Sequence, residues 1–143
     1  PIVEVGEYDK AKECVHKILS INQNYNPAFG IMAILCIISA LKELQNNNFG
    51  NAEKELQEFL EWYSNIHIYS SKEMVNWFII GKVIYQLAQS KNIEAIKFLM
   101  DKLEENAELK ELLKPVRLAL DIVETKNKKL YYNVPQEIRK IVL

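Results

Sequence analysis

The chain has little of what other fold classes and nucleic-acid binding require. Its 143 residues include only four glycines and four prolines, too few for the many tight turns of an all-β fold, so composition predicts an all-α protein. Arg117 and Arg139 are the only arginines, and the net charge is −1. Because phosphate recognition relies on excess positive charge and on arginine, we expect no nucleic-acid binding. The one basic cluster, at 126–129, is read as the solvated end of a helix, where lysines complement the helix dipole.

Cysteine and long apolar runs are also scarce. Cys14 and Cys36 have no CxxC spacing and no nearby histidine at metal-ligand spacing, so we predict two buried thiols, a reducing and therefore cytoplasmic environment, and no metal site. A disulfide between the first two helices is the alternative. The apolar run at 31–41 has 11 residues, whereas a bilayer span needs about 20. It therefore predicts a buried helix and no membrane segment.

One pattern occurs three times along the chain. In each copy, an alanine lies three positions after the first residue and four positions before an apolar residue. The copies are Tyr8-x-x-Ala11-x-x-x-Val15, Phe49-x-x-Ala52-x-x-x-Leu56 and Asn92-x-x-Ala95-x-x-x-Leu99. The alanines are 52 − 11 = 41 and 95 − 52 = 43 residues apart, a period typical of stacked helical units. We therefore predict units over 7–24, 26–64 and 70–106, followed by further helices over 107–143.

Local signals predict where the helices begin and end. Asn26 before Pro27 is typical of an N-cap, Ser70-x-x-Glu73 of a capping box, and Pro115 of a helix break. The predicted helices are 7–21, 26–44, 52–63, 70–89, 92–106, 107–114, 115–126 and a short last helix over 135–142.

The long helices repeat as well. Shifting the second helix by 43 positions superimposes apolar residues on apolar residues: Ile31 on Met74, Ile34 on Trp77, Leu35 on Phe78, Leu41 on Ile84 and Leu44 on Leu87. Each unit is therefore predicted to be a hairpin of one long apolar helix and one shorter amphipathic helix.

Gly6-x-Tyr8-x-x-Ala11 and its later copies resemble the second helix of a tetratricopeptide repeat. The resemblance implies a right-handed stack of antiparallel helical hairpins, closed by a short C-terminal capping helix. The first helices depart from it, because a standard unit has about 34 residues and a Trp, Leu, Gly and Tyr set, in place of which this chain has Cys36, Ser39, Ala40 and Glu43. Lys102 also departs from the pattern. Such elongated hairpins resemble the sensory or scaffold parts of bacterial signalling ATPases and regulators.

The sequence contains no convergent set of reactive residues. His16 is expected on the surface of the first helix. His67 precedes Ser70, but the cap accounts for that serine, and no acid that would orient His67 can be named. No glycine-rich phosphate loop, HExxH or paired-carboxylate pattern occurs. We therefore predict no catalysis and no cofactor.

Two groups of residues are candidates for partner binding. The first is a polar stripe on the fourth helix, within an arc of about 140° at 100° per residue. It consists of Lys72, Asn76, Lys82, Gln86 and Gln89. It is interpreted either as the side that faces a binding groove or as the wet side of an ordinary helix. The second is an aromatic group, Trp62, Tyr63 and Tyr69, which suits either interface anchors or a core that seals the loop.

We conclude from the sequence that 1–143 is a single helical-repeat domain of a longer intracellular protein. Its predicted function is non-catalytic: it binds a protein or peptide, on the surface that the long helices line, as a scaffold or regulatory domain. The alternative is a sensor that holds a small molecule or signalling peptide in a pocket between helices. The end helix of such a stack exposes an apolar face, through which two copies could also associate.

Overall fold

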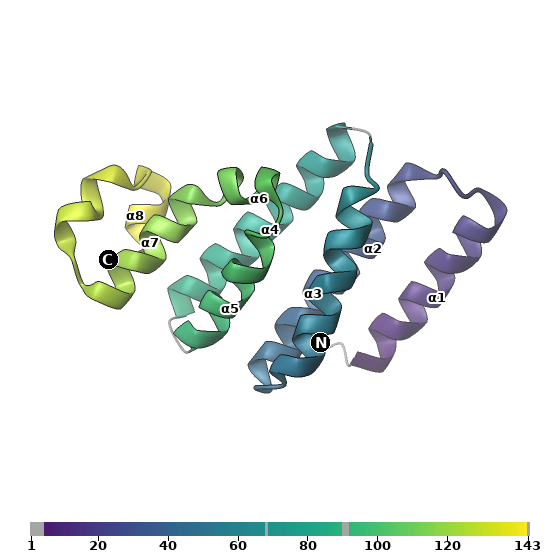
Figure 1. Ribbon diagram of the computed structural model, residues 1–143, viewed down its shortest axis with the longest axis horizontal. Coiled ribbons are helices and arrows are strands. Elements are labelled where there is room, and N and C mark those ends of the chain that lie inside the picture. The colour runs from purple at the N-terminus through teal and green to yellow at the C-terminus, as the bar shows by residue number, and fades with distance from the viewer. Residues whose placement is uncertain (1–4, 68, 90–91, 143) are drawn as a thin grey trace. The chain divides into compact units, whose positions relative to one another are not determined.

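The computed structural model describes residues 5–67, 69–89 and 92–142, and all regular structure among them is helical (Figure 1). The all-α prediction is thus confirmed. The elements are α1 (Val5–Ile21), α2 (Asn26–Gln45), α3 (Phe49–Ser64), α4 (Tyr69–Gln89), α5 (Ile93–Leu103), α6 (Ala107–Leu112), α7 (Lys114–Thr125), the 3₁₀ helix η1 (Lys128–Asn133) and α8 (Gln136–Val142). The chain divides into two compact units, Pro1–Val75 and Asn76–Leu143, whose boundary lies inside α4.

Most predicted helix limits agree with the structure to within a few residues, and two predicted caps are wrong. Tyr25 is the N-cap of α2, whereas Asn26 is the first helical residue. The Asn26 side chain is buried: its Oδ1 accepts from the His67 backbone N–H at 3.1 Å, and its Nδ2 donates to the Ser71 hydroxyl at 2.9 Å. Ser70 is the second residue of α4 and therefore cannot be the N-cap of a capping box.

The later boundaries have clear local causes. Asn92 caps α5 and Asn106 caps α6, each accepting from the backbone N–H three residues on. The sequence predicted that the fifth helix reaches 106, but α5 ends at Leu103, because Asn106 caps a separate helix, α6. Pro115 lies in the first turn of α7, where its missing donor is tolerated, so the predicted break is confirmed. The turn 90–91 lies outside the described residues.

In the first unit, α2 packs against both α1 and α3. α2 is buried on more than one side, and the largest fully buried side chains of this unit are Met32, Ile37, Leu56, Phe59, Tyr63 and Ile66. Two of the repeat alanines are buried, Ala52 here and Ala95 in the second unit, and Ala11 is half-buried. Cys36 is buried too, but Cys14 is exposed, which contradicts the prediction of two buried thiols. Both thiols are free.

α2 is the one helix, within the part of the chain that the structure describes, whose length and composition would allow it to cross a membrane. It has 20 residues and a mean hydropathy of 1.8, so it is longer than the apolar run recognised in the sequence. Of that segment, 61% is buried inside the protein, so most of α2 belongs to the core.

In the second unit, α7 packs against α5, α6, η1 and α8. Its core is aliphatic, and its most deeply buried members on α5 to α7 are Leu99, Met100, Leu103, Leu109, Leu113, Val116, Ala119 and Leu120. At the edge of this core, the Arg117 guanidinium reaches Asp101 at 2.6 Å and Glu104 at 3.2 Å, which ties α7 to α5.

Candidate functional site

An aromatic surface lies on the exposed side of α4. Trp77 is 67% and Tyr85 57% exposed, and Gly81 lies between them, also exposed. These residues are four positions apart and therefore share one face of the helix. The opposite face is the buried one, with Ile79 and Val83 each 1% exposed. We call the surface formed by Trp77, Phe78, Gly81, Ile84 and Tyr85 the α4 face.

A shallow hollow of about 330 Å³ lies on the α4 face and opens to solvent. It is lined by Trp77, Phe78, Gly81, Lys82 and Tyr85, all from this one helix. Gly81 lies between the two exposed rings, and a Cβ atom at this position would point into open space. The Lys82 amine lies 5.5 Å from the centre of the Phe78 ring, a cation–π contact at the rim. Large exposed aromatic side chains around a hollow are typical of a surface that another molecule covers.

The predicted polar stripe lies mainly beside the buried face of α4. Lys82 and Gln89 are exposed, whereas Lys72, Asn76 and Gln86 are half-buried. The stripe therefore does not form one exposed surface. Its Lys82 is the member that also lines the hollow on the α4 face.

The predicted aromatic group is divided between core and surface. Tyr63 is fully buried, its ring 5.6 Å from that of Phe59 and 5.0 Å from the Lys72 amine. Trp62 is half-buried and packs against the core of α1 and α2. Tyr69, in contrast, is 81% exposed. Of the three residues, Tyr69 alone presents most of its surface to solvent.

Trp62 connects all three helices of the first unit. Its ring lies 5.9 Å from that of His16 on α1 and 5.8 Å from that of Phe29 on α2, and its indole N–H donates to Glu58 on α3 at 3.3 Å. His16 is exposed, as predicted, but it also covers this tryptophan. Trp62 therefore has a structural role in holding the helices together.

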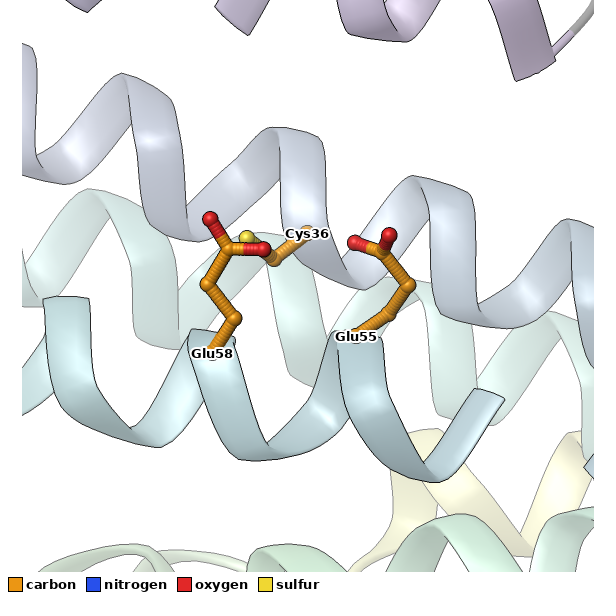
Figure 2. A group of neighbouring side chains, drawn as sticks. All are labelled: Cys36, Glu55 and Glu58. Carbon is orange, nitrogen blue, oxygen red and sulfur yellow. The ribbon is translucent and has the colours of Figure 1, made fainter. Parts of the chain in front are cut away.

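A cluster of polar side chains lies between α2 and α3. Figure 2 shows the Cys36 sulfur of α2 facing the carboxylates of Glu55 and Glu58 on α3. The three possible ligand atoms lie within 4.8 Å of one another, a spacing that a metal ion could bridge. However, the Lys12 amine from α1 contacts Glu55 at 2.6 Å and Glu58 at 3.3 Å. The chain thus supplies its own cation to both carboxylates, and we interpret the cluster as an ion-pair network that joins α1 to α3.

The acid–base properties of this network agree with that interpretation. Burial raises the pKa of the Cys36 thiol to about 12, so at neutral pH it is a thiol and a poor metal ligand. Burial acts to lower the pKa of Lys12, but the hydrogen bond to Glu55 and the neighbouring carboxylates outweigh it, so this pKa is raised. Lys12 is therefore a permanent cation at neutral pH.

His67, the one sequence candidate for a general base, has a structural backbone role. Its side chain is exposed, and its backbone N–H donates to the buried Asn26 side chain. The hydrogen bond joins the segment before α4 to the start of α2.

Two features of the structure, the α4 face and the buried Lys12, were not predicted from the sequence. The signal for the first was the four-residue spacing of Trp77, Gly81 and Tyr85, of which the repeat alignment used Trp77 alone, as an apolar match to Ile34. The signal for the second was absent, because a lysine within an amphipathic helix normally points to water.

No family model matches the chain, and no significant match occurs among curated proteins or solved structures. Its function therefore has to be inferred from its own residues.

Proposed function

We propose that this chain is a non-catalytic protein-interaction or regulatory domain of an intracellular, cytoplasmic protein, and that a helix of its partner docks on the α4 face. The observation that carries the proposal is the exposed pair Trp77 and Tyr85 on either side of the hollow at Gly81. Tryptophan and tyrosine contribute most to the binding energy at protein interfaces. Exposed residues spaced four apart along one face of a helix suit the apolar face of an amphipathic partner helix.

The proposal includes a tetratricopeptide-like stack of hairpins. Three of the five equivalent pairs on the two long helices support the repeat, because they have similar exposure, whereas Trp77 and Ile84 are more exposed than Ile34 and Leu41. Ile31 and Met74 are 43% and 49% exposed, and Leu44 and Leu87 are 2% exposed each. In a stack of this kind, the first helix of each hairpin lines the binding surface. The α4 face belongs to such a helix.

A sensor that encloses a small molecule is the less favoured function. Ligand pockets bury most of their ligand and are usually lined from several sides. The hollow at Gly81 is lined by α4 alone and opens to solvent. That geometry suits a side chain of a docked protein better than a small molecule.

The test is affinity capture from a lysate of the source cells, with the chain and three variants as bait. Trp77→Ala and Tyr85→Ala should each reduce recovery of a specific partner at least about tenfold, as is common for aromatic residues at the centre of an interface. The matched control is Tyr132→Ala, because Tyr132 is 80% exposed but lies on η1. Equal losses with all three variants, or none, would argue against the α4 face.

A further inference from the structure

We propose that the partner helix is α4 of a second copy of this chain, packed antiparallel so that Gly81 meets Gly81 of the second copy. This inference rests on the proposed function and names the partner of the same surface. It follows from the order of side chains along the helix, the open space at Gly81 and the absence of charge on the α4 face. The area that this face exposes sets the strength expected of the pair.

The α4 face has the same pattern in both directions from Gly81. Phe78 and Ile84 lie three positions before and after it, and Trp77 and Tyr85 lie four positions before and after it. In an antiparallel pair with a twofold axis at Gly81, Trp77 lies opposite Tyr85 of the second copy, and Phe78 lies opposite Ile84 of the second copy. Four residues correspond to about 6 Å along a helix, so each large ring is placed beside the hollow and not on top of it. The surface is therefore self-complementary, as a twofold interface must be.

Gly81 permits the close approach that this packing needs. The position is exposed, and no atom lies within 4 Å of where its Cβ would be. Packed helices are separated by about 8–10 Å, and the smaller value requires small residues at the crossing point. Glycine at the twofold axis lets the two backbones approach, so that the four aromatic rings from Trp77 and Tyr85 pack around them.

The charges agree with a second copy as the occupant. None of the five residues of the α4 face is charged. Lys82 lies at the edge, where its amine covers the ring of Phe78 from the same helix. Paired copies therefore bury no charge at these five positions, and the two Lys82 side chains, one residue from the twofold axis, stay at the solvent-exposed edge of the pair. An acidic partner, in contrast, would contact one cation, Lys82, at the edge of the α4 face.

The exposed area predicts a weak pair. Aromatic side chains have about 150–250 Å² of surface each, so the exposed fractions of Trp77 and Tyr85 correspond to roughly 200–300 Å². With the half-buried Phe78 and Ile84, we estimate roughly 300–400 Å² per copy, or about 600–800 Å² for the pair, well below the roughly 1,200–2,000 Å² of standard interfaces. The association should therefore depend on protein concentration.

The experiment is sedimentation velocity of the 143-residue chain from about 10 µM to about 1 mM, the range in which so small an interface is expected to associate. We expect a monomer–dimer equilibrium. Trp77→Ala removes a large ring from the interface, and Gly81→Leu fills the hollow, so each should weaken the dimer at least about tenfold. The matched control is Gly50→Leu, since Gly50 on α3 is exposed and also has no atom within 4 Å of its Cβ position.

Gly81→Leu separates a specific pair from mere adhesion of apolar surfaces. Adhesion would strengthen with the added leucine, whereas the proposed packing would be lost. The register is tested with Gly81→Cys in a Cys14→Ser background, because Cys14 is the exposed native thiol. Mild oxidation should yield a covalent dimer that Gly50→Cys in the same background does not form.

The outcomes distinguish this inference from the proposed function. A chain that stays monomeric up to about 1 mM, yet loses its captured partner with Trp77→Ala, would overturn self-pairing and leave the proposed function standing. A dimer that both Trp77→Ala and Gly81→Leu leave intact would overturn self-pairing by showing that another surface mediates it. If Trp77→Ala changes neither self-association nor capture, both proposals fail.

Discussion

At the scale of single residues, Lys12 is the side chain whose environment differs most from expectation. It is 8% exposed, and its amine contacts Glu55 and Glu58, 43 and 46 positions away. The structure places Lys12 on the inner side of α1, and nothing local in the sequence indicates which carboxylates would meet it. Contacts between residues so distant in sequence are set by helix packing, and this is why the network could not be predicted.

We predict that Lys12→Met lowers the free energy of unfolding by about 1–3 kcal/mol, measured by urea denaturation. The loss arises because two carboxylates beside the buried Cys36 are left without their cation, and partial exposure of Glu55 and Glu58 moderates it. The control is Lys97→Met, which breaks an exposed pair with Glu124 and should cause no measurable loss. Similar losses for both variants would contradict the network's role.

The effect of Lys12 should disappear at high pH. Because the folded-state pKa of Lys12 is raised above its ordinary value of 10.5, its stabilising contribution is fully present below pH 10.5. It is lost as the pH rises through the folded-state pKa. The stability difference between the wild type and Lys12→Met should therefore be constant from about pH 6 to 9 and shrink in stronger alkali.

The two cysteines should react differently with a thiol reagent. Cys14 is exposed, whereas Cys36 is buried with its pKa raised to about 12. At pH 8 we expect one thiol per chain to react rapidly in the native protein and two in denaturant, and Cys14→Ser should remove the rapid phase. If two thiols react rapidly in the native wild-type protein, α2 is not packed as described.

At the scale of helices, local signals predicted the elements well and the orientation of α4 poorly. Caps and prolines act within one turn, so Asn92, Asn106 and Pro115 mark real boundaries. α4 is apolar on several sides, with Ile79 buried and Trp77 exposed two residues apart. When both faces of a helix are apolar, periodicity cannot show which one the neighbouring helices cover. The four-residue spacing of Trp77, Gly81 and Tyr85 places them on one face of α4, but that this face stays exposed followed from packing.

We predict that Asn106→Ala lowers the free energy of unfolding by about 0.5–2 kcal/mol. The Asn106 side chain accepts a hydrogen bond at 3.1 Å from the backbone N–H of Leu109, which no other residue of the helix can satisfy. Asn106→Asp keeps an acceptor in place and should retain most of the stability. Thermal unfolding of the three proteins provides the measurement, and an equal loss in the aspartate variant would argue against capping.

Gly81→Ala should stabilise the monomer. A glycine within a helix costs about 0.5–1 kcal/mol relative to alanine, and the new Cβ meets no atom within 4 Å. We expect Tm to rise by about 1–4 °C at protein concentrations where the chain is monomeric. Gly30→Val is the contrast: Met74 and Ser71 atoms already lie 3.7 Å from the Cβ position, so extra methyl groups should lower Tm. A fall in Tm for Gly81→Ala would show that the position is not open.

At the scale of the whole molecule, composition and periodicity were enough to predict an all-α protein. Few glycines argue against an all-β fold, and the regular spacing of apolar residues is that of helices. The tetratricopeptide-like stack remains a proposal that the matching exposures of Ile31 and Met74 support. The surface that another protein would cover depends on which apolar side chains remain exposed after the core has formed. In this chain Trp77 and Tyr85 are such residues.

The most direct test of the central claim is photo-crosslinking from the α4 face. A benzophenone amino acid would replace Trp77 in one sample and Tyr132, which is 80% exposed on η1, in another. We predict that the probe at 77 forms a crosslink to a second protein chain, either a partner or another copy, and that the probe at 132 does not. Crosslinks from 132 alone, or equally from both positions, would contradict the account.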